Sequence, residues 1–119
     1  MRIELSAQAD GAPAVVEIDT LWREIRESSP SHDVMAEARI VVAGSYADRG
    51  ELKDAIALME PAQKPPKKVR EYHLRQWYVL ADLLDRAGDT MGATRWFREV
   101  LANDADFADT RERLRSLGR

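Results

Sequence analysis

The chain has 119 residues, of which 33% are charged, with both signs interspersed and a formal net charge of -3 at pH 7. A chain of this length suits one domain that buries a core of its own. It contains no cysteine, which excludes a disulfide framework, a thiolate metal site and a cysteine nucleophile. The mild negative charge gives no global electrostatic reason to expect binding to nucleic acid.

The N-terminal part of the sequence predicts a loose end followed by a helix. Residues 1–11 lack the apolar core of a signal peptide, and no stretch approaches the roughly 18 apolar residues of a membrane-spanning helix. We therefore expect a cytoplasmic protein with a flexible N-terminus. Residues 12–28 predict a capping helix, because Pro13 suits a first turn and apolar side chains recur at helical spacing. These are Val15, Ile18, Leu21, Trp22 and Ile25.

Residues 33–61 predict a first pair of helices. The first would run from about Val34 to Asp48, capped by Ser31 or Asp33, and the second from Leu52 after a turn at Gly50. Small side chains gather in the first helix, at Ala36, Ala38, Ala43, Gly44, Ser45 and Ala47. A glycine inside a helix costs about 1 kcal/mol relative to alanine, so Gly44 indicates either a close helix contact or an open groove floor.

Pro61, Pro65 and Pro66 interrupt the helical pattern and predict a connector over 62–68. A second helix pair is predicted over 69–103, with Gly88 ending its first helix and Asp89 capping the next. The apolar stripes of this pair run through Trp77, Leu80, Ala81 and Leu84, and then through Ala93, Trp96, Phe97, Val100 and Leu101. A final capping helix is expected over 104–117, starting at Asp104 or Asp106.

The two predicted pairs share a pattern at an offset of 38 residues, the distance from Val42 to Leu80. The matched positions are Val42, Ala43, Tyr46, Gly50, Ala55 and Met59 with Leu80, Ala81, Leu84, Gly88, Ala93 and Phe97. The order W-x2-L-small-x2-L, a Gly-Asp turn and A-x3-F resembles the tetratricopeptide repeat (TPR), although the period exceeds the family's length of about 34. The chain is more narrowly similar to a group of actinobacterial TPR proteins.

The resemblance implies an all-α fold, a right-handed helical-repeat stack in which two TPR-like helix pairs lie between two capping helices. It also implies that a partner binds along the concave surface lined by the first helix of each pair. That surface would combine Ile40, Gly44, Ala47 and Asp48 with Arg75, Tyr78, Asp82, Asp85 and Arg86. A groove with small, aromatic and charged residues suits a peptide or a partner helix, so we expect a non-catalytic protein–protein interaction module. Asp82 and Arg86 are equally well explained as a surface i,i+4 pair.

Two other functions compete with this hypothesis. A homodimer is expected if the end helices leave Trp22 or Trp96 exposed. The second is binding of phosphates or of an acidic partner segment by a basic cluster of Lys64, Lys67, Lys68, Arg70, His73 and Arg75. The alternative interpretation of this cluster is a solvated connector that its prolines stiffen. Nucleic acid is not favoured, since few aromatic residues are interleaved with these cations.

An enzyme is not expected from this sequence. His32 and His73 are the only imidazoles, they fall in different segments, and no metal-ligand spacing surrounds them. Ser45 follows Gly44 but lacks the remainder of a nucleophile elbow, and there is no glycine-rich phosphate loop. We therefore expect no catalytic residue, metal, cofactor or small-molecule substrate.

Overall fold

The computed structural model describes residues 12–118, and their side chains from Glu17 onward. This part of the chain is helical and contains no strand, which confirms the predicted all-α class. The elements are α2 (Ala12–Glu27), α3 (His32–Asp48), α4 (Leu52–Leu58), the 3-10 helix η1 (Glu60–Gln63), α5 (Glu71–Arg86), α6 (Thr90–Asn103) and α7 (Thr110–Leu117). The flexible end expected at 1–11 lies outside the described residues.

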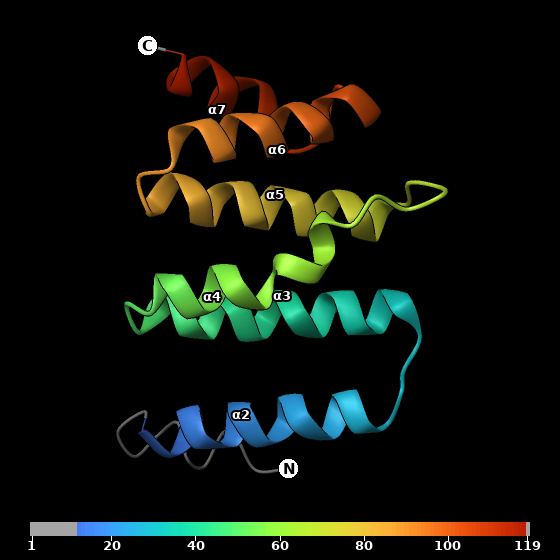
Figure 1. Cartoon of the computed structure of the whole chain (residues 1–119), viewed down its shortest axis with the longest axis vertical. Coiled ribbons are helices and arrows are strands. Elements are labelled where there is room, and N and C mark those ends of the chain that lie inside the picture. The colour runs from blue at the N-terminus through green and yellow to red at the C-terminus, as the bar shows by residue number, and fades with distance from the viewer. Residues whose placement is uncertain (1–11, 119) are drawn as a thin grey trace.

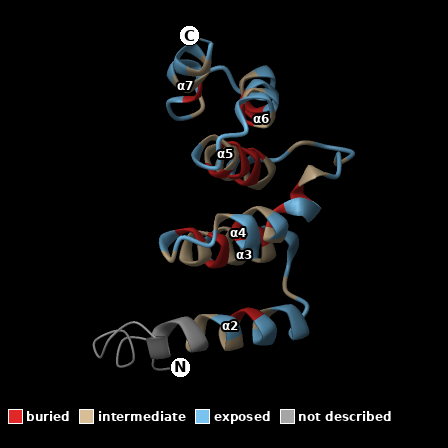
Figure 2. Cartoon of the chain, turned by 60° about the vertical axis from the view of Figure 1, so that its left-hand side comes forward, coloured by how far each residue is buried: buried red, intermediate tan, exposed pale blue. Residues whose placement is uncertain are grey.

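The molecule measures 42 × 32 × 21 Å along its three principal axes. The helices are stacked in chain order along the longest of these axes (Figure 1). Helix α5 lies at the centre of the stack and packs against α3, α4 and α6, while α2 lies on α3 and α7 on α6. Buried residues concentrate where α3, α4, α5 and α6 face one another (Figure 2). The helices predicted at the two ends are therefore present, and each covers one end of the central pairs.

Burial repeats at the predicted offset of 38 residues. Ala43 and Ala55 of the first pair are fully buried, as are the corresponding Ala81 and Ala93 of the second. The larger matched residues Met59 and Phe97 are also fully buried, whereas Tyr46 and Leu84 are both half-buried at the edge of the core. Small side chains at the centre of each pair allow the two helices to approach closely.

The same backbone arrangement ends the first helix of each pair. Gly50 and Gly88 adopt positive φ angles of 81° and 88°. The N–H of Gly50 donates to the Ala47 carbonyl at 2.9 Å, and that of Glu51 to the Tyr46 carbonyl at 2.9 Å. The corresponding bonds after α5 are Gly88 to Asp85 at 3.0 Å and Asp89 to Leu84 at 2.8 Å. These are Schellman motifs, which favour glycine because a side chain strains the left-handed conformation.

The sequence placed the last helix too early. Helix α7 begins at Thr110, and the residues before it form turns in which the Asp106 N–H donates to the Asp104 carboxylate at 3.0 Å. Ala108 has a φ of 47°, which is incompatible with a regular helix. The Thr110 hydroxyl is buried and donates to the Phe107 carbonyl at 2.7 Å. Local side-chain bonding by Asp and Thr therefore delays the helix.

The connector is also tied to the core. Helix η1 extends the first pair to Gln63 and α5 begins at Glu71, so the irregular segment runs over 64–70, two residues later than the predicted 62–68. The Trp77 indole Nε1 donates to the Ala62 carbonyl at 2.8 Å, and both residues are buried. This bond fixes the end of η1 on α5 and determines where the following lysine-rich segment starts.

Candidate functional site

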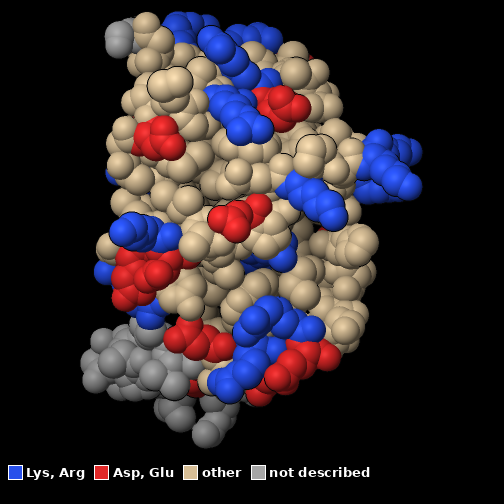
Figure 3. Space-filling model, in the orientation of Figure 1, with Lys and Arg blue, Asp and Glu red and all other residues tan. Residues whose placement is uncertain are grey.

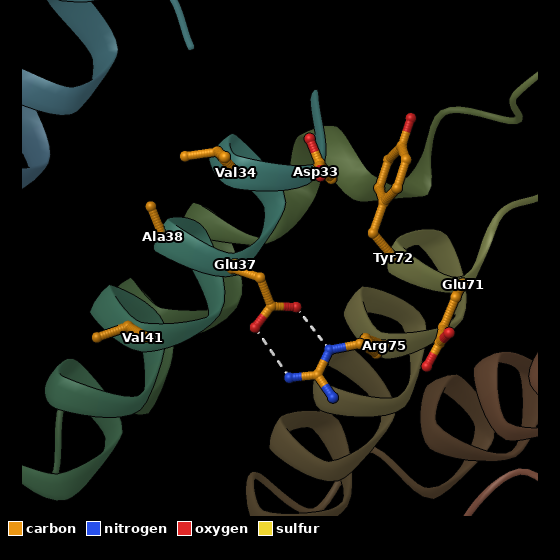
Figure 4. A pocket seen from close by; sticks show the side chains of 8 residues that line it. All are labelled: Asp33, Val34, Glu37, Ala38, Val41, Glu71, Tyr72 and Arg75. Atoms are coloured by element: carbon orange, nitrogen blue, oxygen red, sulfur yellow. Dashed lines mark hydrogen bonds and ion pairs between the residues drawn. The ribbon is translucent and has the colours of Figure 1, made fainter. Parts of the chain in front are cut away.

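An open groove of about 560 Å³ runs between the N-terminal halves of α3 and α5 (Figure 4). We call it the α3–α5 groove. It is lined by Asp33, Val34, Glu37, Ala38, Val41, Glu71, Tyr72 and Arg75. Both helices are first helices of their pairs, so residues at equivalent positions in the two pairs face each other across the groove.

The α3 wall of the groove carries an exposed apolar ridge. Val34, Ala38 and Val41 stand at i, i+4 and i+7 and therefore share one side of the helix. Val34 is 50% exposed and Val41 59% exposed. In Figure 4 their side chains point to the same side of α3, away from the Glu37 carboxylate. The opposite side of α3 is already buried in the core, so this ridge is apolar surface that remains partly exposed within the described part of the chain.

Glu37 and Arg75 join the two walls. The Arg75 Nε donates to Glu37 Oε2 at 2.5 Å and the Nη2 to Oε1 at 2.9 Å, which makes a bidentate pair. The hydrogen bonds from Arg75, with a smaller contribution from its charge, hold the pKa of the Glu37 carboxyl below its ordinary value. Both side chains are 46% exposed, so the pair fixes local geometry more than it contributes to stability.

Arg75→Gln is expected to raise the pKa of Glu37 towards its ordinary value of 4.5. Because the folded-state pKa is depressed, the contribution of the pair to stability is present above that ordinary value and is lost as the pH falls through the folded-state pKa. The Glu37 carboxyl resonance followed by NMR over an acid titration measures the shift. Arg86→Gln, a matched change at the other end of α5, should leave this titration unchanged; a shift there of equal size would contradict the assignment.

The residues of α3 that the sequence placed in the partner surface lie along its C-terminal half. Asp48 is exposed, Ile40 is half-buried and packs against the core, and Ala47 is buried. A Cβ built on Gly44 would meet no atom within 4 Å. Of the two explanations for this glycine, close helix contact is therefore wrong, because the space beside it is open.

The corresponding residues of α5 divide between two places. Arg75 lies in the α3–α5 groove, whereas Asp82 and Asp85 accept hydrogen bonds from Arg113 Nη2 of α7 at 2.8 and 3.2 Å. The Tyr78 hydroxyl donates to Asp109, and its ring meets that of Phe97 edge-on at a centroid distance of 5.3 Å. Arg86 pairs with Asp82 at 3.6 Å. Arg113 thus joins Tyr78, Asp82 and Asp85 to α7.

The exposed ridge was missed although the sequence holds a signal for it. Helix α3 has apolar residues on every side, and a helix of that kind is buried all round or leaves an apolar face uncovered. The repeated pattern includes the buried residues Val42 and Ala43 but neither Val34 nor Val41. Tyr72 on the facing helix was missed because it precedes the part of α5 that resembles the repeat.

The groove contains no metal-binding arrangement. Among the described residues, no group of three or more His, Asp or Glu side chains is placed to hold a metal ion. Within the same part of the chain, no helix is both long enough and apolar enough to cross a membrane.

Comparison of the chain with family models, curated proteins and solved structures finds no match.

Proposed function

We propose that the chain is a non-catalytic protein–protein interaction module that holds an amphipathic helix of another protein in the α3–α5 groove. The exposed ridge of Val34, Ala38 and Val41 is the observation that carries this proposal, because its spacing complements apolar side chains on one face of a helix. Each fully covered valine contributes roughly 1.5–3 kcal/mol. Val34 and Val41 are already about half covered, so the ridge offsets only part of the association cost of about 4–15 kcal/mol, and charged contacts at the rim must contribute as well.

Charge defines the expected partner more closely. Arg75 is neutralised by Glu37, which leaves Asp33 and Glu71 as the charges at the mouth of the groove. A partner helix with Lys or Arg flanking its apolar face would complement them, whereas an acidic helix would be repelled. The proposed ligand is therefore a basic amphipathic helix.

The repeated features of the two helix pairs support a TPR-like stack. Matching burial and matching Schellman motifs recur at 38 residues, and α5 packs on both helices of the preceding pair. In a right-handed TPR-like superhelix the first helices line the concave face, and the α3–α5 groove lies between the two first helices.

A homodimer is the second candidate, and the end helices weigh against it. Trp22 is 8% exposed and Trp96 5% exposed, so neither offers an apolar end face. The Trp22 ring lies near the guanidinium groups of Arg26 and Arg39, at 5.4 and 5.8 Å. Light scattering over about a tenfold range of concentration should show a monomer. If the protein instead forms a stable dimer and Val41→Asp dissociates it, the α3–α5 groove is the interface of a homodimer and not a site for another protein.

Val41→Asp is expected to weaken binding of a partner helix by at least about tenfold, because it places a charge in the apolar contact and adds to the acidic rim. Helical peptides selected from a displayed library against the wild-type protein serve as ligands, and fluorescence anisotropy measures their affinities. Selected peptides should carry apolar residues at i and i+4 with basic flanks. The matched control is Met91→Asp, at an 85% exposed position of α6.

The two variants separate the groove from the general surface. Circular dichroism should show equal helicity in both, since both replaced side chains are exposed. Peptides that bind the Val41 and Met91 variants equally well would place the binding surface elsewhere and overturn the proposal.

A further inference from the structure

A second cavity lies on the other side of Tyr72, which lines both hollows. It has a volume of about 560 Å³ and is formed by the start of α3, the segment after η1 and the start of α5. We call it the connector cavity. Figure 3 shows basic side chains projecting at the right-hand edge of the molecule, where Figure 1 places this connector. His32 and His73, far apart in sequence, both line it.

The lining of the connector cavity is cationic. It includes Arg39, Lys64, Lys67, Lys68 and Arg70, and none of the described residues that line it is Asp or Glu. The chain as a whole has a net charge of -3, so this concentration of positive charge runs against the overall balance. Like charges held together raise the local potential and attract an anion.

Arg39 differs from the other cations of this lining because part of its guanidinium is buried. Its Nη1 donates to Oε1 of the buried Gln76 at 2.8 Å. Its Nε is buried and has no hydrogen-bond partner in the described part of the chain. Burial lowers the pKa of Arg39, which reports the cost of a charge without a facing carboxylate. An anion in the cavity would supply the missing counter-charge.

Two helix starts lie at the cavity, and each of these helices has one acidic residue in its first turn, Asp33 in α3 and Glu71 in α5. His32 is the first residue of α3 and Arg70 immediately precedes α5, so both helices direct their N-terminal ends here. The Ser31 hydroxyl donates to Asp33 and does not cap α3. The His73 Nδ1 accepts from the Arg70 N–H at 2.9 Å, which leaves Nε2 as the donor of the neutral ring.

We propose that the connector cavity binds a compact anion that carries phosphate groups. Lysine point charges, a guanidinium and helix N-termini are the groups that proteins use for phosphate, and here they converge from three segments. The volume fits a small molecule. An extended nucleic acid backbone would need a basic surface longer than this one, on a chain that is acidic overall.

Isothermal titration calorimetry of the full chain with sodium pyrophosphate tests this site. Saturable binding is expected, and it should weaken as sodium chloride is added. Lys64→Gln/Lys67→Gln/Lys68→Gln should weaken binding by at least about tenfold, because three charge-assisted contacts are lost. The matched control Lys53→Gln/Arg98→Gln/Arg115→Gln removes the same charge from exposed positions outside the cavity. It should bind within about twofold of the wild type.

Two further readouts distinguish the chemistry. The Nε–H resonance of Arg39 in 15N NMR spectra should move on addition of pyrophosphate, because an anion in the cavity changes the electrostatic environment of this guanidinium. Citrate should bind more weakly than pyrophosphate. The proposal is overturned if no saturation is seen, if both triple variants lose affinity equally, if citrate binds as tightly, or if a single-stranded oligonucleotide binds far more tightly than pyrophosphate. Circular dichroism verifies that both variants fold.

Discussion

Phe97→Ala is expected to lower the free energy of unfolding by about 3–5 kcal/mol. Phe97 is fully buried in α6, so the variant loses the transfer energy of the ring and leaves a cavity among close-packed helices. The substitution also removes two contacts of the Phe97 ring. One is the edge-on contact with Tyr78, and the other is with the Arg113 guanidinium, which lies 4.9 Å from the ring centroid. The stacking of α7 on the second pair would weaken with it. Urea unfolding followed by circular dichroism measures the loss.

Two further variants serve as comparisons for this measurement, one at the equivalent buried position and one at an exposed position. Met59→Ala changes the equivalent position of the first pair, which is also fully buried, and should cost about 2–5 kcal/mol. Met91→Ala changes an exposed residue of α6 and should stay within about 0.5 kcal/mol of the wild type. If Phe97→Ala resembled Met91→Ala, the described packing of α6 would be wrong.

Ala93→Leu is expected to lower stability by about 1–3 kcal/mol through overpacking. Ala93 is fully buried opposite α5, where the small Ala81 is fully buried as well. A leucine there has no free volume and must push the two helices apart or adopt a strained rotamer. Thermal and urea unfolding should both show the loss, since the contact between α5 and α6 is the most extensive in the molecule.

Ala102→Leu is the matched control for overpacking. Ala102 lies in the same helix but is exposed, so the larger side chain meets solvent and the effect should be within about 0.5 kcal/mol. An Ala93→Leu protein as stable as the wild type would mean that the repeat register misplaces this position.

The helix pairs were predictable because they depend on local and periodic signals. Glycine at the two turns, small residues at the closest approach and large apolar residues four positions later determine burial through spacing alone. The structure confirms these features at Gly50, Gly88, Ala55 and Ala93. These patterns lie within each helix pair, so they can be recognised without knowing which other helices pack against that pair.

The candidate site was harder to predict because contacts between distant helices determine it. Arg113 reaches back from α7 to Asp82 and Asp85, and nothing in the pattern of α7 distinguishes it from its solvated neighbours. The exposure of Val34 and Val41 likewise depends on which sides of α3 the other helices cover. Periodicity identifies an apolar face, but only the packed structure shows whether another helix covers it.

The pairing of Glu37 with Arg75 has a consequence for how such a chain can be lengthened. These residues occupy the same position in successive pairs, as their separation of 38 residues shows. Copying either pair in tandem would set glutamate against glutamate or arginine against arginine at the new junction, and like charges in contact repel. The two pairs are thus unlike halves of one unit, and a longer array would have to grow by adding both together.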